Sequence, residues 1–112
     1  FGPQEVRDAS LLLADYGIRQ MGFLLLGGPG ETRASVARSL AFVDDLPLDA
    51  VKLTVGVRIY PETRVAEIAR EKQVIDAADD LLFPRFYLEP ELAHWLPQVA
   101  AEWAEPRPHW ML

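Results

Sequence analysis

The sequence predicts an α/β fold in which parallel strands alternate with helices. The evidence is a short apolar run at residues 20–26 bounded by glycines, an alternating apolar and polar segment at 50–57, and amphipathic segments around both. Strands that are separated by full helices form βαβ units, and their strands pair in parallel. Half of the 112 residues are hydrophobic and a quarter are charged, which is the composition of a folded domain.

The first two elements are a helix at 3–16 and a strand at 20–26. Pro3 suits the first turn of a helix, apolar residues recur every three to four positions from Val6, and Gly17 stands where a C-cap glycine is expected. The apolar character of the strand is nearly continuous, which predicts a strand that is covered on both faces.

The next helix is expected at 32–45, with Thr32 as its N-cap and Pro47 as its stop. A strand at 50–57 follows, and its alternation divides the side chains between two faces. One face receives Val51, Leu53, Val55, Val57 and Ile59, and the other receives Lys52, Thr54, Gly56, Arg58 and Tyr60.

The last third of the chain is less regular. A third helix is predicted over 61–72, beginning at Pro61 or Glu62, and a connector at 73–86 leads to a short strand near Phe86–Leu88. The segment after it has helical spacing that Pro97 interrupts. The tail "PRPHWML" is expected to be loosely held.

Two or three parallel strands make a poor sheet alone, because both of its faces and both of its edges need cover. The sequence therefore indicates a segment of a larger array, such as a partial (β/α) barrel with flanking helices and a helical C-terminal segment. The net charge of −6 without a basic cluster argues against a nucleic-acid partner. No apolar run is long enough to span a membrane, and the absence of cysteine fits a cytoplasmic protein.

Chemistry is expected at the carboxyl ends of the strands. The loop Gly27-Gly28-Pro29-Gly30-Glu31 lacks the Lys of a phosphate-binding P-loop, and Arg33 replaces the third glycine of a dinucleotide fingerprint. Two interpretations of the loop remain. It is a tight turn that needs glycine, or a place where the backbone approaches a ligand and Glu31 accepts hydrogen bonds.

The second strand has one polar face, with Lys52, Thr54 and Arg58. This face is either solvated or lines a barrel lumen that a ligand occupies. In the second case Gly56 leaves room for the ligand and Arg58 suits a carboxylate or phosphate. His94 and His109 stand far from any carboxylate cluster, so no metal site is expected.

Three segments in order, "GFLLLGGPGET", "DAVKLTVGVRIYPET" and "LLFPRFYL", resemble the later half of the radical S-adenosylmethionine (radical SAM) barrel. They are similar in particular to the subset whose longer members often carry a cobalamin-binding domain. In that family a strand with the pattern G-x-I-x-G-x-x-x-E lies beside the adenine of the cofactor. Here Phe23 stands in place of the first Gly, Leu25 in place of Ile, and Gly27 and Glu31 match.

The resemblance implies that residues 1–88 are the C-terminal part of a radical SAM barrel and 89–112 a helical extension. It implies roles for residues at the two strand ends, although it singles out none as catalytic. Leu25 would pack on the adenine, Gly27, Gly28 and Gly30 would allow close backbone approach, Glu31 would accept ribose or amine hydrogen bonds, and Arg58 would meet a carboxylate. Lys52, Thr54 and Tyr60 would contact substrate.

One departure from the family is large. Radical SAM oxidoreductases hold a [4Fe–4S] cluster on a C-x₃-C-x₂-C run, and this chain has no cysteine. Because the chain begins at Phe1, we expect it to be a fragment that is inactive alone, with the rest of its own barrel as its partner. Cobalamin remains an option in the parent enzyme. The alternative is a non-catalytic α/β binding or oligomerisation module, which self-associates through exposed strand edges.

Overall fold

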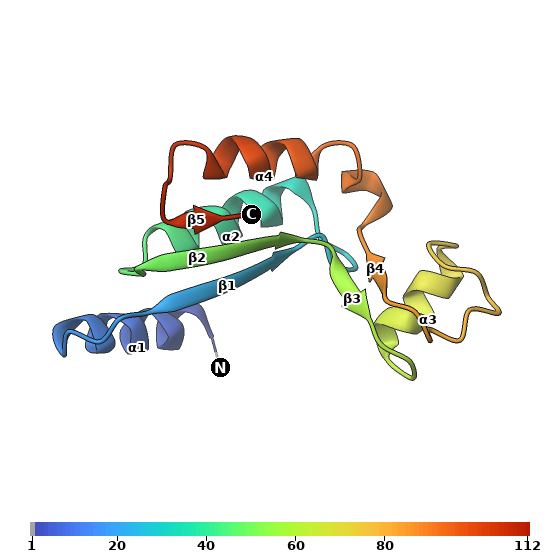
Figure 1. The fold of residues 1–112 in the computed structure, drawn as a ribbon, viewed down its shortest axis with the longest axis horizontal. Helices are drawn as coiled ribbons and strands as arrows, with labels where there is room; N and C mark the ends of the chain where they lie inside the picture. The colour runs from blue at the N-terminus through green and yellow to red at the C-terminus, as the bar shows by residue number, and fades with distance from the viewer. Residues whose placement is uncertain (1) are drawn as a thin grey trace.

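The computed structural model of the chain describes residues 2–112, so Phe1 lies outside the described residues (Figure 1). Helices and strands alternate along most of the sequence. In order they are α1 (Pro3–Asp15), β1 (Met21–Leu26), α2 (Arg33–Asp44), β2 (Ala50–Val55), β3 (Val57–Ile59), α3 (Arg64–Glu71), β4 (Arg85–Tyr87), the 3₁₀ helix η1 (Pro90–Leu92), α4 (Leu96–Ala104) and β5 (Trp110–Met111).

The predicted α/β class is confirmed, because β1, β2 and β5 form a parallel sheet in the order β1-β2-β5. In its register Leu25 lies beside Thr54, and Phe23 lies beside Lys52. The expectation that the tail is loosely held was wrong. Trp110 is buried and pairs with Val51 at the second edge of the sheet.

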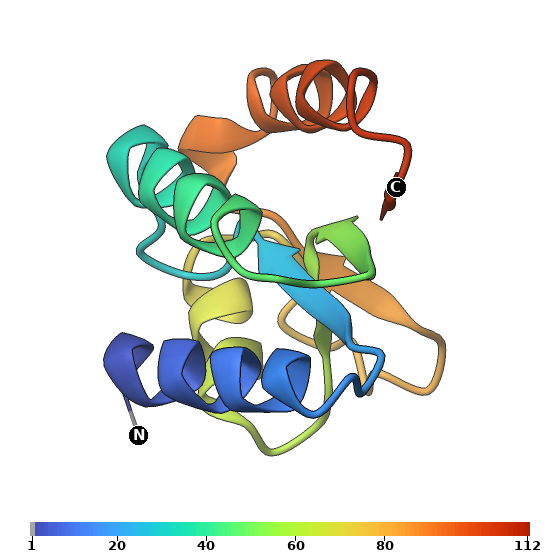
Figure 2. The same ribbon diagram turned by 90° about the vertical axis from the view of Figure 1, so that its left-hand side faces the viewer.

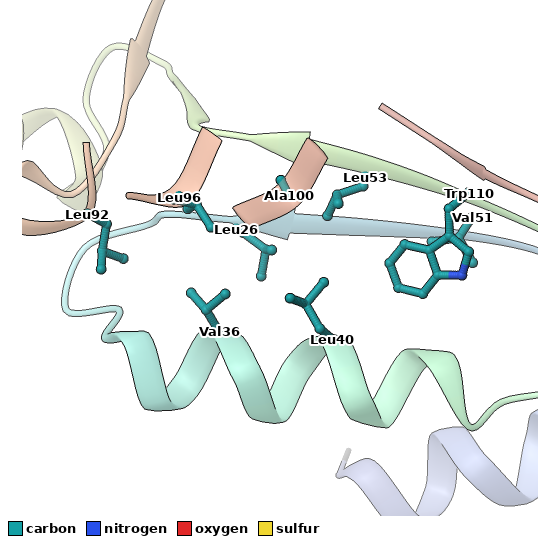
Figure 3. Close-up of a cluster of buried hydrophobic side chains, with 9 residues drawn as sticks. All are labelled: Leu26, Val36, Leu40, Val51, Leu53, Leu92, Leu96, Ala100 and Trp110. Carbon is teal, nitrogen blue, oxygen red and sulfur yellow. The ribbon is translucent and has the colours of Figure 1, made fainter. Parts of the chain in front are cut away.

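One face of this sheet carries the main core, which lies between the strands and helices α2 and α4 (Figure 3). The buried members of the core come from six elements and include η1. They are Leu26, Val36, Leu40, Val51, Leu53, Leu92, Leu96, Ala100 and Trp110. The segment after residue 88 therefore packs on the same core as the first two strands.

The second strand is shorter than predicted, because the chain turns at Gly56. Gly56 has φ +95°, a conformation that only glycine adopts readily, and its amide donates to the Leu26 carbonyl at 2.8 Å. Residues 57–59 then form β3, which pairs antiparallel with β4 in a separate two-stranded sheet. Ile59 is buried as its position in the alternation suggested, but it belongs to a second, smaller core with α3.

Helices α2 and α3 begin at side-chain caps. Thr32 caps α2 as predicted, since its hydroxyl accepts from the Ser35 amide at 3.1 Å and Ser35 Oγ accepts from the Thr32 amide at 2.9 Å. The third helix begins later than expected, at Arg64, because Thr63 caps it and Glu62 adopts φ +62°.

Helix α1 lies beside α2 and not over the exposed face of the sheet (Figure 2). Arg7 joins it to α2 through an ion pair with Asp45 at 2.7 Å, and Ser10 accepts and donates hydrogen bonds with the Gln20 side chain. No helix in the described part of the chain has the length and apolar character needed to cross a lipid bilayer.

Candidate functional site

The face of the β1-β2-β5 sheet opposite α2 and α4, named here the open face, carries the strand residues expected to bind ligands. Alternation along β1 sends Leu24 and Leu26 into the core and Phe23 and Leu25 to the open face. Phe23 is 74% exposed and Leu25 is 57% exposed. The prediction that β1 is covered on both faces was therefore wrong for this chain.

Two polar residues of β2 share the open face with these apolar side chains. Thr54 is the registered neighbour of Leu25, and Lys52 is the neighbour of Phe23; both polar residues are half-buried. Neighbouring side chains on one face of a sheet lie within contact distance. The open face thus offers an apolar surface with a hydroxyl and an ammonium group at its side.

The glycine turn at residues 27–30 follows β1 directly and meets the turn after β2. Gly27 has φ +95°, and a Cβ placed on it would stand 3.6 Å from the amide nitrogen of Gly56. A Cβ on Gly28 would lie 3.5 Å from Val57 Cγ2. The structure therefore brings the glycine turn against the turn at Gly56, a residue that the sequence had placed inside the second strand.

Glu31 folds back over the glycine turn. One carboxylate oxygen accepts from the Gly27 amide at 3.2 Å, and the other accepts from Ser35 Oγ at 3.0 Å. The Glu31 amide itself donates to the Gly28 carbonyl at 3.1 Å, and the Gly30 amide donates to Glu89 at 3.3 Å. These three amides are engaged within the chain, which gives a second reason why the turn is not a phosphate cradle.

Arg58 and Tyr60 lie in a different part of the molecule from Leu25. Both are exposed at the β3–β4 sheet, where the Arg58 guanidinium stacks over the Tyr60 ring at 4.9 Å from its centroid and Arg58 pairs with Phe86. Stacking of this kind is weakly attractive at an exposed site. The sequence placed these two residues on the same face as Lys52 and Thr54, and the turn at Gly56 separates them.

Glu89 is a residue of the site that sequence reasoning missed. It is buried, with 5% exposure, and its carboxylate contacts Lys72 Nζ at 2.7 Å, the Tyr87 hydroxyl at 2.5 Å and the Gly30 amide. Burial acts to raise the pKa of Glu89, but the hydrogen bonds from Lys72, Tyr87 and Gly30 outweigh it and the pKa is lowered.

The partners of Glu89 respond in the opposite direction. The hydrogen bond to Glu89 raises the pKa of Lys72. Burial, and then the hydrogen bond to Glu89, raise the pKa of Tyr87. All three groups therefore keep their usual charges near neutral pH, with a buried carboxylate facing one ammonium group.

The residues present do not fit a metal or an iron–sulfur cluster. The chain has no cysteine, and residues 2–112 include no group of three or more His, Asp or Glu side chains arranged to hold a metal ion. What the open face offers is exposed Leu25 beside the half-buried Thr54 hydroxyl, next to the glycine turn.

Comparison with known proteins gives one partial likeness. A stretch of 67 residues, 60% of this chain, is 33% identical to an uncharacterized methyltransferase from Pyrococcus horikoshii. The matched stretch is 14% of the length of that relative, so the chain spans about one-seventh of it. No protein-family model matches the chain, and no solved structure matches it.

Proposed function

We propose that this chain is the C-terminal part of a radical SAM enzyme, where it supplies one wall of the S-adenosylmethionine and substrate pocket. The observation that carries the proposal is the pairing of exposed Leu25 with Thr54, directly beside the glycine turn at the carboxyl ends of two parallel strands. Sites of α/β folds gather at such strand ends. The partial likeness to a methyltransferase supports the same cofactor, since S-adenosylmethionine is a common methyl donor.

In the proposed pocket each residue acts by binding or by shaping the wall. Leu25 packs on the adenine, and the Thr54 hydroxyl donates or accepts a hydrogen bond at the ligand edge. Gly27 and Gly28 keep the backbone free of side chains, while Glu31 braces the turn through the Gly27 amide. The cofactor itself supplies the activated group for methyl transfer or radical chemistry.

In the proposal the cluster lies outside this chain, and the remaining polar residues of the chain contact the substrate or the cofactor. The [4Fe–4S] cluster is bound by cysteines of the parent enzyme. Lys52 contacts the substrate from β2. Arg58 stays a candidate for cofactor contact, and Tyr60 for substrate contact, only if the β3–β4 sheet borders the pocket in the complete protein.

The free edge of β1 supports the partial barrel. The carbonyls of Gln20 and Leu26 accept hydrogen bonds from amides at the two ends of β2. Because backbone groups of successive residues point to opposite sides of a strand, those of Met21, Phe23 and Leu25 point away from β2. A largely apolar groove between α1, β1 and α2 runs along this edge. We infer that a further parallel strand of the same barrel pairs here, which would place α1 as its crossover helix.

The binding role is tested in the natural polypeptide that contains this chain. Leu25→Asp should weaken binding of S-adenosylhomocysteine about ten- to hundredfold in calorimetry, since burial of a leucine is worth about 1.5–3 kcal/mol. Leu12→Asp is the matched control, because Leu12 is 56% exposed but lies on α1. Equal affinities of the two variants would refute the assignment.

The runner-up is a non-catalytic α/β module that self-associates, and the exposed Phe23 and Leu25 on the open face favour it. In that case Phe23→Lys should convert an oligomer to a monomer in sedimentation velocity. The sequence encoded upstream of residue 1 distinguishes the two proposed functions. A C-x₃-C-x₂-C run there supports the enzyme, and a start codon immediately before residue 1 supports the module.

A further inference from the structure

The Gly27–Gly30 turn is held from outside by a single residue that is distant in sequence. The Glu89 carboxylate accepts a hydrogen bond from the Gly30 amide at 3.3 Å, and the Glu89 amide donates one to the Gly27 carbonyl at 2.8 Å. Glu89 thus contacts both ends of the turn. Its side chain also accepts from Tyr87 of β4 and from Lys72 just after α3.

The buried Glu89 carboxylate is stabilised by the groups that surround it. A buried charge is costly unless it is paired and hydrogen-bonded, and Glu89 is the buried charged residue among residues 2–112. Here one ammonium group, one hydroxyl and one backbone amide surround it. Hydrogen bonds to an ionised carboxylate are about twice as strong as neutral ones, so the arrangement can restrain the backbone that donates to it.

The turn has a conformation that needs such restraint. Gly27 has φ +95° and Gly30 has φ +80°, and a glycine loop that is free in solution samples many other backbone angles. Glu31 restrains the first residue of the turn from within, while Gly30 is exposed and has its amide fixed by Glu89. Without Glu89 the second half of the turn would keep only the hydrogen bond from the Glu31 amide to the Gly28 carbonyl.

We propose that Glu89 is a positioning residue, which holds the Gly27–Gly30 turn in the form that receives the ligand and links it to Lys72 and the β3–β4 sheet. This inference rests on the proposed function, in which the turn borders the S-adenosylmethionine pocket. A preformed turn lowers the ordering cost of binding, so Glu89 contributes to affinity without touching the ligand.

The first test measures the turn itself in the natural polypeptide that contains this chain. Amide hydrogen exchange of Gly30, relative to Leu40 in the core, should become at least about tenfold faster in Glu89→Leu, because the amide loses its acceptor. Glu91→Gln is the matched control, since Glu91 is exposed in η1, and it should leave the ratio unchanged. An unchanged ratio in Glu89→Leu would overturn the proposal.

A second pair of variants separates positioning from general stability. Glu89→Gln can still accept from Gly30, but its amide group faces the Lys72 ammonium, so donor meets donor and exchange at Gly30 should rise. Adding Lys72→Met removes that conflict and should restore the slower exchange. Failure of the second substitution to rescue the first would count against the linkage through Lys72.

The third test uses the natural polypeptide and S-adenosylhomocysteine. Glu89→Leu should weaken binding, because only molecules whose turn has the receptive form bind the ligand, and Glu91→Gln should not. Faster exchange with unchanged affinity would overturn the positioning role. If the unsubstituted protein does not bind S-adenosylhomocysteine, the proposed function fails instead, and the exchange experiment still decides whether Glu89 holds the turn.

Discussion

Replacing Gly27 with alanine should destabilise the chain more than replacing Gly30, although both glycines have positive φ in the same turn. A Cβ placed on Gly27 would stand 2.5 Å from Leu88 Cδ1 and 3.2 Å from Leu96 Cδ2. A Cβ placed on Gly30 meets no heavy atom within 4 Å. Gly30→Ala therefore measures the backbone cost alone, and Gly27→Ala adds the steric cost.

The expected magnitudes follow from these two terms. An alanine at positive φ costs about 1–2 kcal/mol, which is the prediction for Gly30→Ala. Overpacking a core adds about 1–3 kcal/mol. Leu88 is half-buried and its methyl group can rotate away, whereas Leu96 is fully buried and must shift. The steric term should fall at the lower end of its range, so Gly27→Ala should cost about 2–4 kcal/mol.

Urea denaturation followed by circular dichroism measures both variants on one scale, and the free energy of unfolding comes from the midpoint at a constant m value. A loss in Gly27→Ala that equals the loss in Gly30→Ala would refute the tight approach of Gly27 to Leu88 and Leu96. A loss near zero in both variants would refute the positive φ angles as well.

Three further results are expected. Thr32→Ala should lower the free energy of unfolding by about 1 kcal/mol because the cap to the Ser35 amide is lost, and Thr32→Ser should keep most of it; equal losses would argue against the cap. Trp110→Ala should cost about 3–5 kcal/mol by thermal unfolding, whereas Met111→Ala, at an exposed position, should cost little; a small loss for both would mean that β5 does not seal the core. The pKa of Glu89 is lowered below its ordinary value of 4.5, so the carboxylate stabilises the fold fully above that pH, and this contribution is lost as the pH falls through the lowered pKa. In Glu89→Gln the free energy of unfolding should therefore decrease less steeply at acid pH. An unchanged slope would contradict the lowered pKa.

The sequence was informative wherever a signal was local. The N-cap of α2 at Thr32 came from a pattern of a few residues, and the parallel pairing of β1 with β2 came from the helix predicted between them. The apolar character of β1 was recognised, but its exposure was not, because composition does not reveal whether covering atoms belong to the same chain.

The errors came from features without a local signal. The alternation of apolar residues continues through Val57 and Ile59, so it does not reveal that the chain turns at Gly56, where φ is +95°, and that β3 pairs with β4. No local pattern identified Glu89, because the Gly30 amide that donates a hydrogen bond to it is 59 positions away in sequence. The pairing of β5 involves two residues, too few for any periodicity to appear.

The division of the hydrophobic residues into two clusters has a consequence for the order of folding. The smaller cluster is contained within residues 59–87, whereas the larger one joins Leu26 to Trp110. Contacts that are close in sequence form faster, because closing a short loop costs less chain entropy. We therefore expect α3 and the β3–β4 sheet to fold early and to shorten the loop between β2 and α4. The slow step would then be the arrival of Leu96 and Trp110 on a sheet that is already partly paired.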